Sequence, residues 1–412
     1  MAKFFEAGAW LAGNPAQSCS SGVHVSQPAP IGCWTKAAAG GGSDGAHRYR
    51  FGDHSGLLPY VQPQTPASLD AGEYVAKGTD EEFGVETLIR AAAAAGASLD
   101  MCNVVTYRNN LNKIFGLPFD TKVAWTVDAC LLPAPASDAA AATASIAATG
   151  SSGAGSSAPA GPLFLDIVQQ EDWTGDPADR DRFMKWGYRF EALCTGQQVA
   201  DASSEFGLLL RTRIAQHRIF LGAEIDCYDP AVANGSSSNG RGGKEQQAAQ
   251  PTVQQPGQQQ HPQQQLPPLA AMLELKTYRK PSHPQQWRTV HRYKHPKWWL
   301  QSFLAGVPRL ALGARDERGI LLGVDIVATA DLPRISAQNG ARWSGNQALV
   351  FGDSVLVWMR AQAAAQPGVH LRFSYDGESG SGAAGAIHCS TVEGGTLPGR
   401  IQSCLRECGL AP

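Results

Sequence analysis

The sequence predicts an α+β protein in which mixed or antiparallel β-sheets are flanked by helices, forming one large domain over residues 1–412. Three observations support this. Apolar strands of period 2 occur in pairs separated by short turns. Stretches of helical periodicity lie between those pairs. The chain is 43% hydrophobic over 412 residues, which is enough for a substantial core.

Two low-complexity segments interrupt this pattern. Residues 134–160 are almost entirely Ala, Ser, Gly and Pro, and residues 231–268 consist of Gly, Ser and Asn followed by a Gln/Pro tract. Neither segment can bury enough apolar surface to offset its ordering entropy. We therefore expect two disordered inserts within one domain, because the sequence on both sides of each reads as one core.

The strands are read from alternation. FGLLLRTRIAQHRIFLGAEID predicts a hairpin, and RLALGARDERGILLGVDIVATADL predicts another that turns at residues 317–319. GAEIDCYD (222–229) and LAAMLELKT (269–277) both read as strands on either side of the second insert. Since the cost of closing a loop rises slowly with its length, we expect these two strands to be neighbours in one sheet.

Helices are predicted over residues 80–95, 178–194, 295–305 and 350–365. The helix at 295–305 has the clearest boundaries, because Pro296 lies in its first turn and Gly306 follows its last residue. Proline suits the start of a helix, where its missing N–H has no partner to lose, and glycine suits the left-handed residue at the end.

Charge and cysteine usage restrict the class of protein. A net charge of -2 and a pI near 6.6 exclude a uniformly basic nucleic-acid coat, so a polyanion must bind at a focused site. Nine scattered cysteines predict reduced thiols in an intracellular protein. Glu6 interrupts the N-terminal apolar residues, and no apolar run reaches membrane-spanning length, so we expect no signal peptide, no membrane span, and a nuclear or cytoplasmic location.

The two strands beside the second insert carry acidic residues that could form a catalytic metal site. Alternation puts Glu224 and Asp226 on one side of the first strand, and Glu274 and Lys276 on one side of the second. If these polar sides coincide, three carboxylates and one amine meet, and they require a further cation. Oxygen ligands favour Mg²⁺ or Mn²⁺, with two ions suited to phosphodiester or pyrophosphate cleavage. The alternative is a solvent-facing sheet surface with cross-strand Glu–Lys pairs.

Three further features favour a catalytic site over a solvent-facing sheet surface. Glu191 lies among aromatic residues in KWGYRFEALC, and Gln301 interrupts the apolar helix HPKWWLQSFLAG. Residues 278–297 contain six Lys or Arg, three His and no acid, with interleaved aromatic residues typical of a nucleic-acid groove. Each has a plain alternative: a glutamate on a helix surface, a hydrogen-bonded core glutamine, and a solvated basic face.

In this order, GYRFE, GAEID, LELKT and KWWLQSFLAGVP closely resemble motifs of the DXO family of eukaryotic RNA 5′-end decapping enzymes and exoribonucleases, and TYRNNLNKIFGLPF resembles its arginine motif. The resemblance extends from about Gly32 to the helix near Trp358. It implies that Lys276 and Gln301 contact the scissile phosphate. It also implies metal ligation by Glu191, Glu224, Asp226, Glu274 and the main-chain carbonyl of Leu275.

The resemblance also implies a set of substrate contacts. Arg108, flanked by Tyr107 and Asn109, corresponds to the arginine that contacts RNA phosphates. HRYRFGDHSGLLPY is similar to the family's N-terminal segment, which makes Arg48 a substrate ligand. Glu86 in DEEFGVETL is matched only with a one-residue shift, and Gly207 lies where the family has a residue lining the site.

The implied activity is metal-dependent removal of incomplete or NAD-type caps from RNA 5′ ends, including 5′-triphosphate and unmethylated caps, together with 5′-3′ exoribonuclease digestion. RNA 5′ ends are then the partner. Two other functions stay open. A restriction-like DNA nuclease shares the same arrangement of acids and lysine. A noncatalytic scaffold that stabilises a nuclear 5′-3′ exoribonuclease is the other, since some relatives of the family act in that way.

Overall fold

The computed structural model describes residues 3–15, 22–37, 48–77, 84–132, 161–168, 176–235, 265–377 and 385–410. The insert predicted at 134–160 lies outside these residues, as does most of the insert predicted at 231–268. The beginning of the second insert is helical instead: α6 spans Pro230–Ala233. Its cap explains this, because the Asp229 side chain accepts a hydrogen bond from the Ala231 amide and proline occupies the first turn.

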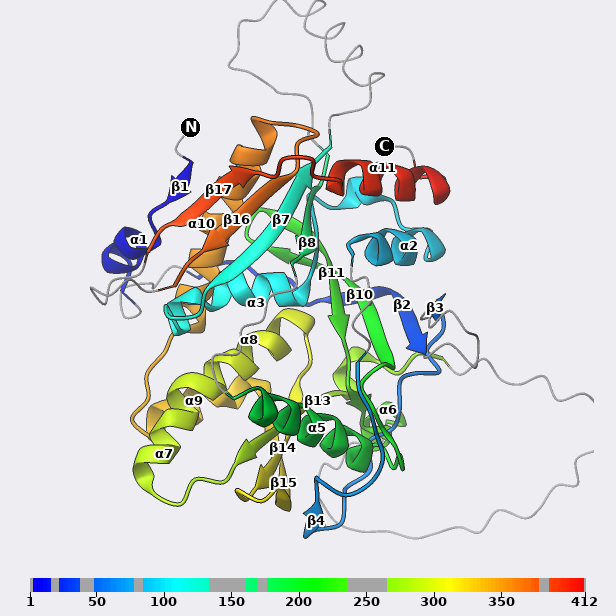
Figure 1. Cartoon of the computed structure of the whole chain (residues 1–412), viewed down its shortest axis with the longest axis vertical. Helices are drawn as coiled ribbons and strands as arrows, with labels where there is room; N and C mark the ends of the chain where they lie inside the picture. The colour runs from blue at the N-terminus through cyan, green and yellow to red at the C-terminus, as the bar shows by residue number, and fades with distance from the viewer. Residues whose placement is uncertain are drawn as a thin grey trace, which may run out of the picture.

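A mixed ten-stranded sheet forms the upper part of the molecule (Figure 1). Its strand order is β1-β17-β16-β7-β8-β6-β11-β10-β2-β3. The bounds are β1 (Phe4–Phe5), β2 (Ala29–Ala37), β3 (Arg48–Phe51), β6 (Val104–Tyr107), β7 (Trp125–Leu131), β8 (Leu163–Ile167), β10 (Glu205–Ile214), β11 (His217–Glu224), β16 (Leu371–Tyr375) and β17 (Ile387–Thr391). Strand β6 pairs in parallel with both β11 and β8, while the other ladders are antiparallel.

A five-stranded sheet lies below it, in the order β12-β13-β14-β15-β4. Its bounds are β12 (Cys227–Tyr228), β13 (Met272–Arg279), β14 (Arg309–Arg315), β15 (Ile320–Ala328) and β4 (Ala67–Ser68). Strand β13 pairs in parallel with β14. A small third ladder joins β5 (Tyr74–Val75) to β9 (Ala200–Asp201).

Helices cover these sheets. Their bounds are α1 (Ala7–Gly13), α2 (Glu86–Ala94), α3 (Arg108–Gly116), α5 (Pro177–Cys194), α7 (Pro284–Thr289), α8 (His295–Ala305), α9 (Leu332–Gln338), α10 (Gly345–Ala364) and α11 (Leu397–Glu407), with short helical turns η1 (Leu99–Met101), η2 (Leu117–Phe119), η3 (Leu269–Ala271), η4 (Val290–Lys294) and η5 (Thr329–Asp331). Buried residues of α2 and α11 pack on one face of the ten-stranded sheet, and those of α3, α8 and α10 pack on the other.

The apolar residues of the five-stranded sheet divide between two cores. Leu273 and Leu275 pack with Phe190 of α5, whereas Met272 belongs to the core shared with α3 and α8. Strand β13 is therefore covered on both faces, with α5 in front of it in Figure 1. This placement puts the middle of β13 between α5, α3 and α8.

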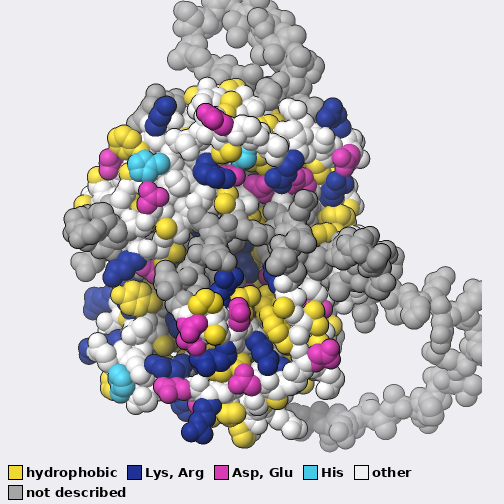
Figure 2. Space-filling model, in the orientation of Figure 1, with side chains coloured by type: hydrophobic (Ala, Val, Ile, Leu, Met, Phe, Trp, Pro, Cys, Tyr) yellow, Lys and Arg dark blue, Asp and Glu magenta, His cyan; other side chains and the backbone are white. Residues whose placement is uncertain are grey.

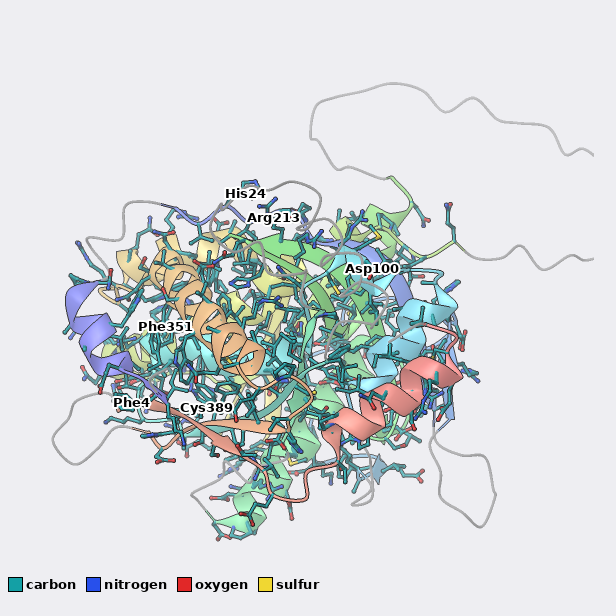
Figure 3. The ribbon with its side chains drawn as sticks, turned by 90° about the horizontal axis from the view of Figure 1, so that it is seen from above. Phe4, His24, Asp100, Arg213, Phe351 and Cys389 are labelled. Carbon is teal, nitrogen blue, oxygen red and sulfur yellow. The ribbon has the colours of Figure 1, made fainter. Side chains whose placement is uncertain are left out.

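The N-terminal segment packs at one edge of the ten-stranded sheet, where β1 pairs with β17. The ring of Phe351 on α10 lies 5.9 Å from that of Phe5 and 5.1 Å from that of Trp10, between centroids. Figure 3 shows Phe4 and Cys389 along the same edge, where β1 pairs with β17. None of the described helices combines the length and apolar composition that crossing a bilayer requires.

Several predicted elements are confirmed. The hairpins β10–β11 and β14–β15 form, the second turning through Gly319 at φ 77°. Helix α8 has the predicted bounds, with Gly306 in the left-handed conformation. Helix α5 begins at Pro177, one residue before its predicted start. Helix α10 begins at Gly345, five residues before its predicted start at residue 350. Helix α2 begins at Glu86 rather than at residue 80, and residues 80–83 lie outside the described part of the chain.

One prediction about strand pairing is wrong. The segment 222–229 is not a single strand beside 269–277, because it divides between the two sheets. Strand β11 ends at Glu224 within the ten-stranded sheet, and only Cys227 and Tyr228 pair with β13, Cys227 lying opposite Leu273. The chain crosses between the sheets at Ile225 and Asp226. Period-2 alternation continues through this crossing, so it did not reveal the change of sheet.

All eight cysteines in the described residues are free thiols, and seven of them are buried. Burial raises the pKa of Cys102 and of Cys130 to about 12, so both thiols stay protonated at neutral pH. The expectation of reduced cysteines is confirmed for this part of the chain.

Candidate active site

The crossing between the two sheets places two carboxylates side by side. Glu224 ends β11 and is exposed, and Asp226 follows it, half-buried, before β12 begins. The Leu275 amide of β13 donates to Asp226 Oδ2 at 2.6 Å. This hydrogen bond connects the end of the first sheet directly to the middle of β13. The acids predicted from the two strands are therefore adjacent, although they belong to different sheets.

Glu274 is the buried centre of the site, with 1% of its surface exposed. Three side chains donate to its carboxylate: Arg108 Nη1 at 3.0 Å, Lys276 Nζ at 2.6 Å and Gln301 Nε2 at 2.6 Å. A buried carboxylate is costly unless it is paired and hydrogen-bonded, and this one is. A solvent-facing Glu–Lys pair on a sheet surface, the alternative left open by the sequence, does not describe Glu274.

Helix α5 supplies the fourth carboxylate. Its residues Trp186, Phe190 and Cys194 are buried against β13, and this anchors the helix in front of the five-stranded sheet. Glu191 is half-buried on the same helix. Burial, followed by the charges of Asp226 and Glu224, raises the pKa of Glu191 well above its usual value. Glu191 is therefore close enough to both acids to interact with them electrostatically.

The four carboxylates titrate differently. Although part of Glu224 is exposed, the protein around its carboxylate displaces water, and this loss of hydration together with the charge of Glu205 raises the pKa of Glu224 to about 7. Burial and the charge of Glu274 raise the pKa of Asp226 to about 7. Burial alone would raise the pKa of Glu274, but the charges of Arg108 and Lys276 outweigh it and lower that pKa. Burial disfavours the Lys276 ammonium, yet Glu274 and Asp226 raise its pKa. With all four acids ionised, Arg108 and Lys276 would set two positive charges against four negative ones, and this negative excess contributes to the raised pKa values of Glu191, Glu224 and Asp226.

The donor chemistry fits a divalent cation, although the side chains do not form a coordination shell as they stand. Across the described ranges, no three side chains of His, Cys, Asp or Glu stand in an arrangement that would hold a metal ion. Glu274 and Asp226 oxygens accept hydrogen bonds from protein donors instead. Three crowded carboxylates with raised pKa values are nonetheless a set of oxygen ligands whose repulsion Mg²⁺ or Mn²⁺ would relieve.

Metal addition should therefore stabilise the protein in a pH-dependent way. Carboxylates with raised pKa values stabilise the fold when protonated, and that stability is lost as pH rises from about 4 through 7. Mn²⁺ needs the ionised groups, so we expect it to raise the melting temperature more at pH 8 than at pH 5.5. The expected gain at pH 8 is on the order of 3 kcal/mol at one hundred times the dissociation constant.

Differential scanning fluorimetry with Mn²⁺ or an equal ionic strength of NaCl would measure this effect. The variant Glu224→Gln is the matched control, because it removes one ligand and keeps the side-chain volume. A melting temperature that rises equally at both pH values, or equally with NaCl, would contradict this expectation.

Arg108 lies in the site, but it does not contact solvent as a phosphate ligand would. It is the first residue of α3, its side chain is 7% exposed, and it forms an ion pair with Glu274. A cation at a helix N-terminus is disfavoured by the helix dipole, and the Glu274 carboxylate compensates for this. The neighbouring Asn109 is exposed. Tyr107 is half-buried, and its hydroxyl donates to the Gly84 carbonyl at 3.2 Å, away from the acids.

Gly207 lies directly beside the acids. It pairs with Glu224 across the β10–β11 ladder and with Trp34 across the β10–β2 ladder. A Cβ atom at Gly207 would lie 2.1 Å from the Trp34 ring, so the buried Trp34 requires glycine here. This contact could not be predicted, since strand alternation says nothing about the residue on the neighbouring strand.

One predicted substrate ligand, Glu86, is not brought to the acids. Glu86 receives two hydrogen bonds from Arg400 of α11, at 2.6 and 2.8 Å, and Arg400 also pairs with Asp166 at 3.1 Å. Glu86 therefore faces α11. Arg48 begins β3 and pairs with Ala37, and its side chain lies outside the described part of the structure.

Three functional candidates were missed by the sequence analysis. Glu205 and Lys77 both act on the charge of Glu224, in opposite directions. The Tyr188 ring on α5 stacks on Tyr74, with 6.2 Å between centroids, and the charges of Glu224 and Glu191 affect its pKa, which burial raises. Glu205 could have been found, because alternation places it on the same side of β10 as Gly207. Lys77 lies beyond any strand and had no such signal.

The predicted base-stacking groove at 278–297 is only partly present. Tyr278 is 7% exposed and packs against Trp287 and Trp298, so it belongs to the core. Trp287 is half-buried against His291, and Tyr293 is exposed. Tyr278 lies on the buried side of β13, whereas Trp287 and Tyr293 lie on the helical segments α7 and η4, which turn some of their residues toward solvent. In the view of Figure 2, Lys and Arg side chains on the lower half of the molecule are interspersed with acidic ones, so the surface seen there is not uniformly basic.

Comparison with known proteins gives a consistent result. A family model described as RAI1 like PD-(D/E)XK nuclease matches residues 26–135 and 160–401. The chain is 22% identical to decapping nuclease RAI1 of Emericella nidulans over 365 residues, covering 83% of each. It is 23% identical to the human decapping and exoribonuclease protein over 261 residues, covering 60% of this chain and 51% of that protein.

Solved structures show the same fold. Schizosaccharomyces pombe Rai1 in complex with 3′-FADP superposes with a TM-score of 0.65 at 19% identity, covering 95% of this chain and 100% of that one. Candida albicans Rai1 in complex with pU5-Mn²⁺ superposes with a TM-score of 0.62 at 17% identity, covering 95% and 94%. The α+β architecture predicted from the sequence is confirmed by these matches.

Proposed function

The chain belongs to the family of RAI1-like PD-(D/E)XK nucleases, and from this membership we propose that it removes incomplete or NAD-type caps from RNA 5′ ends. The substrates are RNAs that begin with a 5′-triphosphate, an unmethylated guanosine cap or NAD, and 5′-3′ exoribonuclease digestion follows. The observation that carries the proposal is Glu274, buried on β13 and held by Arg108, Lys276 and Gln301. The relatives named as decapping nucleases, and the related structures with pU5-Mn²⁺ and with (3′-NADP)⁺ and calcium, support it.

Five groups of this chain would hold the cofactor, one or two Mg²⁺ or Mn²⁺ ions. A bound divalent cation supplies Lewis-acid stabilisation of the phosphoryl oxygens. The proposed ligands are Glu191, Glu224, Asp226, Glu274 and the Leu275 carbonyl. The Leu275 amide already holds Asp226 in place, and Arg108 holds Glu274, so two of the ligands are positioned by protein donors.

The remaining groups act on the substrate. Lys276 Nζ and Gln301 Nε2 both donate to Glu274 Oε1 at 2.6 Å, so both donors lie beside the proposed metal ligands. They donate to the scissile phosphate and offset the charge that builds on it during in-line attack. Glu191 orients the attacking water on the opposite side. Arg108 acts through Glu274 and is a positioning residue in this scheme.

Product analysis on end-labelled RNAs tests this function. We expect the wild-type chain, with Mg²⁺ or Mn²⁺, to release labelled 5′ products from triphosphate, unmethylated-cap and NAD-capped RNAs. A DNA of the same sequence with a 5′-phosphate should be cleaved more slowly, because RNA-specific contacts include the 2′-hydroxyl. Faster cleavage of the DNA would favour the restriction-like DNA nuclease, and intact RNA under all conditions would contradict the proposal.

The alternative function is that of a noncatalytic scaffold that binds and stabilises a nuclear 5′-3′ exoribonuclease. A scaffold gains nothing from gathering four carboxylates around one partly buried lysine, and this favours an enzyme. Pull-down of the exoribonuclease by wild-type protein and by a metal-site variant would show whether binding and cleavage are separate. We propose that the protein works in the nucleus, the cytoplasm or both, where capped RNA is found.

A further inference from the structure

Three cations gather where β13 and β14 end, apart from the four acids. Arg279 is the last residue of β13 and Arg315 the last of β14, and the two are partners in the parallel ladder. Neighbouring strands lie about 4.8 Å apart, so like charges at partner positions repel each other. Lys294, the last residue of η4, is exposed and interacts electrostatically with both arginines. The side chains of Arg279, Lys294 and Arg315 form the cation cluster.

Carboxylates do not neutralise the cation cluster. The protein around Lys294 displaces water from its ammonium group, and this loss of hydration lowers its pKa together with the charges of Arg315, Arg279 and Lys297. Among the described residues, no carboxylate forms an ion pair with Lys294 or Arg315. Arg279 pairs with Glu317 at 3.0 Å, but those side chains are 50% and 78% exposed, so the pair is weak. An external anion would relieve the repulsion.

An aromatic ring holds the Arg315 guanidinium in place. Its central carbon lies 4.4 Å from the centre of the Trp186 ring of α5, and its Nη1 donates to the Asp316 carbonyl at 3.1 Å. Burial and the charges of Arg279 and Arg182 lower the pKa of Arg315, and the Asp316 carboxylate opposes them only in part. A planar guanidinium that is already fixed by stacking loses little freedom when it binds an anion such as phosphate.

Helix α8 links the acids to the cation cluster. Gln301 Nε2 donates to Glu274 at 2.6 Å. Lys294, Lys297 and Gln301 have the i, i+3, i+7 spacing of one helix face, and the backbone of Lys294 is helical. Lys294 therefore lies about 10 Å along the axis from Gln301. Lys297 lies between them, and its side chain is 51% exposed although it pairs with Asp120 at 2.9 Å. A chain of anions leaving Gln301 along this face would meet two ammonium groups in turn.

Two other elements give a similar separation between the acids and the cation cluster. On β13, Arg279 lies three residues beyond Lys276, which is about 10 Å at the rise of a strand. On α5, Trp186, whose ring contacts Arg315, lies five residues before Glu191, which is about 7.5 Å at the rise of a helix. The cluster is thus held at a fixed position relative to the proposed metal ligands by three separate elements.

We propose that the cation cluster binds phosphates of the RNA chain on the 3′ side of the cleaved linkage, along a track that begins at Gln301 and passes Lys297. This inference rests on the proposed function and extends the substrate contact beyond the nucleotide at the acids. Proteins that bind single strands commonly follow the backbone with a line of cations. Contacts to phosphate carry no sequence information, so the track accepts any base.

The salt dependence of RNA binding tests this proposal. Each phosphate contact with a single strand adds about 0.7 to the slope of log affinity against log salt concentration. For a 5′-phosphorylated RNA of about eight nucleotides, we expect Lys294→Gln to reduce that slope by roughly this amount and Lys294→Arg to keep it. A dinucleotide, which ends before the cation cluster, should bind both variants and the wild type alike. Fluorescence anisotropy in Mg²⁺ measures the affinities, using 3′-labelled RNA with phosphorothioate linkages that slow cleavage.

Arg213→Gln is the matched control. Arg213 is exposed on β10, six residues from Gly207 and so about 20 Å along the strand from the acids (Figure 3). Its loss removes one charge and should leave the slope unchanged. A slope that Lys294→Gln does not reduce would assign the cluster to an acidic protein segment instead and overturn the proposal, as would an equal reduction by Arg213→Gln. Binding is read without turnover, so a failure of cap removal is distinguishable from a failure of this proposal.

Discussion

Replacing Glu274 by Gln and Asp226 by Asn together is expected to lower kcat for capped RNA by at least about 10³-fold. The double change removes two of the four carboxylates among the five proposed metal ligands, and loss of an outer-shell partner alone typically costs about 10 to 100-fold. It also removes the carboxylate on which Lys276 and Gln301 converge. Single-turnover cleavage of end-labelled NAD-capped RNA would measure the loss.

Stability must be measured beside activity, because the two changes act in opposite directions. Glu274→Gln leaves buried Arg108 and Lys276 without their anion, which we expect to cost about 3 to 5 kcal/mol. Asp226→Asn removes a carboxylate whose pKa is raised to about 7, so it should stabilise the metal-free protein above pH 7. Asp128→Asn, which breaks an ion pair with Arg372 on the ten-stranded sheet, is the control for charge loss elsewhere. Wild-type activity in a folded double variant would exclude the proposed chemistry.

The change Arg108→Leu is expected to lower the free energy of unfolding by about 3 kcal/mol or more. It leaves Glu274 buried with one cation fewer, and the Glu274 pKa should rise as a result, since the Arg108 charge opposes the effect of burial on it. Turnover should fall as well, because Glu274 would no longer be held in place. Urea denaturation at pH 7.5 would give the free energy, and the rate of cap removal would give the second effect.

The exposed ion pair between Arg90 and Glu407 provides the comparison. Its side chains are 43% and 56% exposed, so Arg90→Leu should cost less than about 1 kcal/mol and leave turnover unchanged. Equal destabilisation by the two arginine changes would show that burial of the Arg108–Glu274 pair has no special importance. A fully active Arg108→Leu protein would remove Arg108 from the positioning role.

Local sequence pattern was sufficient to find most of the acidic site. Alternation separated Glu224 and Asp226 from their apolar neighbours, and the structure has Ala223, Ile225 and Cys227 buried as that pattern requires. The ends of α8 followed from Pro296 and Gly306. Each of these patterns depends on residues only a few positions apart. They can therefore be recognised without knowledge of the tertiary fold.

The relationships between elements could not be predicted in the same way. The split of 222–229 between two sheets depends on which strands pair, and alternation is the same whichever partner is chosen. The partner of Arg108 is 166 residues away at Glu274, so the motif around Arg108 indicated a functional arginine but not an ion pair. The close approach of Trp34 to Gly207 likewise exists only once β2 and β10 lie side by side.

The basic segment 278–297 shows how composition can mislead. Its many cations and aromatic rings favoured a nucleic-acid groove, yet Tyr278 is buried on β13 against Trp298, and Tyr293 is exposed on η4. A helix divides its residues among faces, so a count of residue types along the chain does not say which of them share a surface.

Anomalous diffraction from crystals soaked in Mn²⁺ at pH 8 tests the central claim most directly. We expect one or two manganese peaks among Glu191, Glu224, Asp226 and Glu274, with the Leu275 carbonyl within ligand distance. The same crystals of the double variant should show none. Absence of any peak there in the wild-type protein, with the four side chains still apart and Glu274 bonded only to Arg108, Lys276 and Gln301, would contradict a metal-dependent nuclease site.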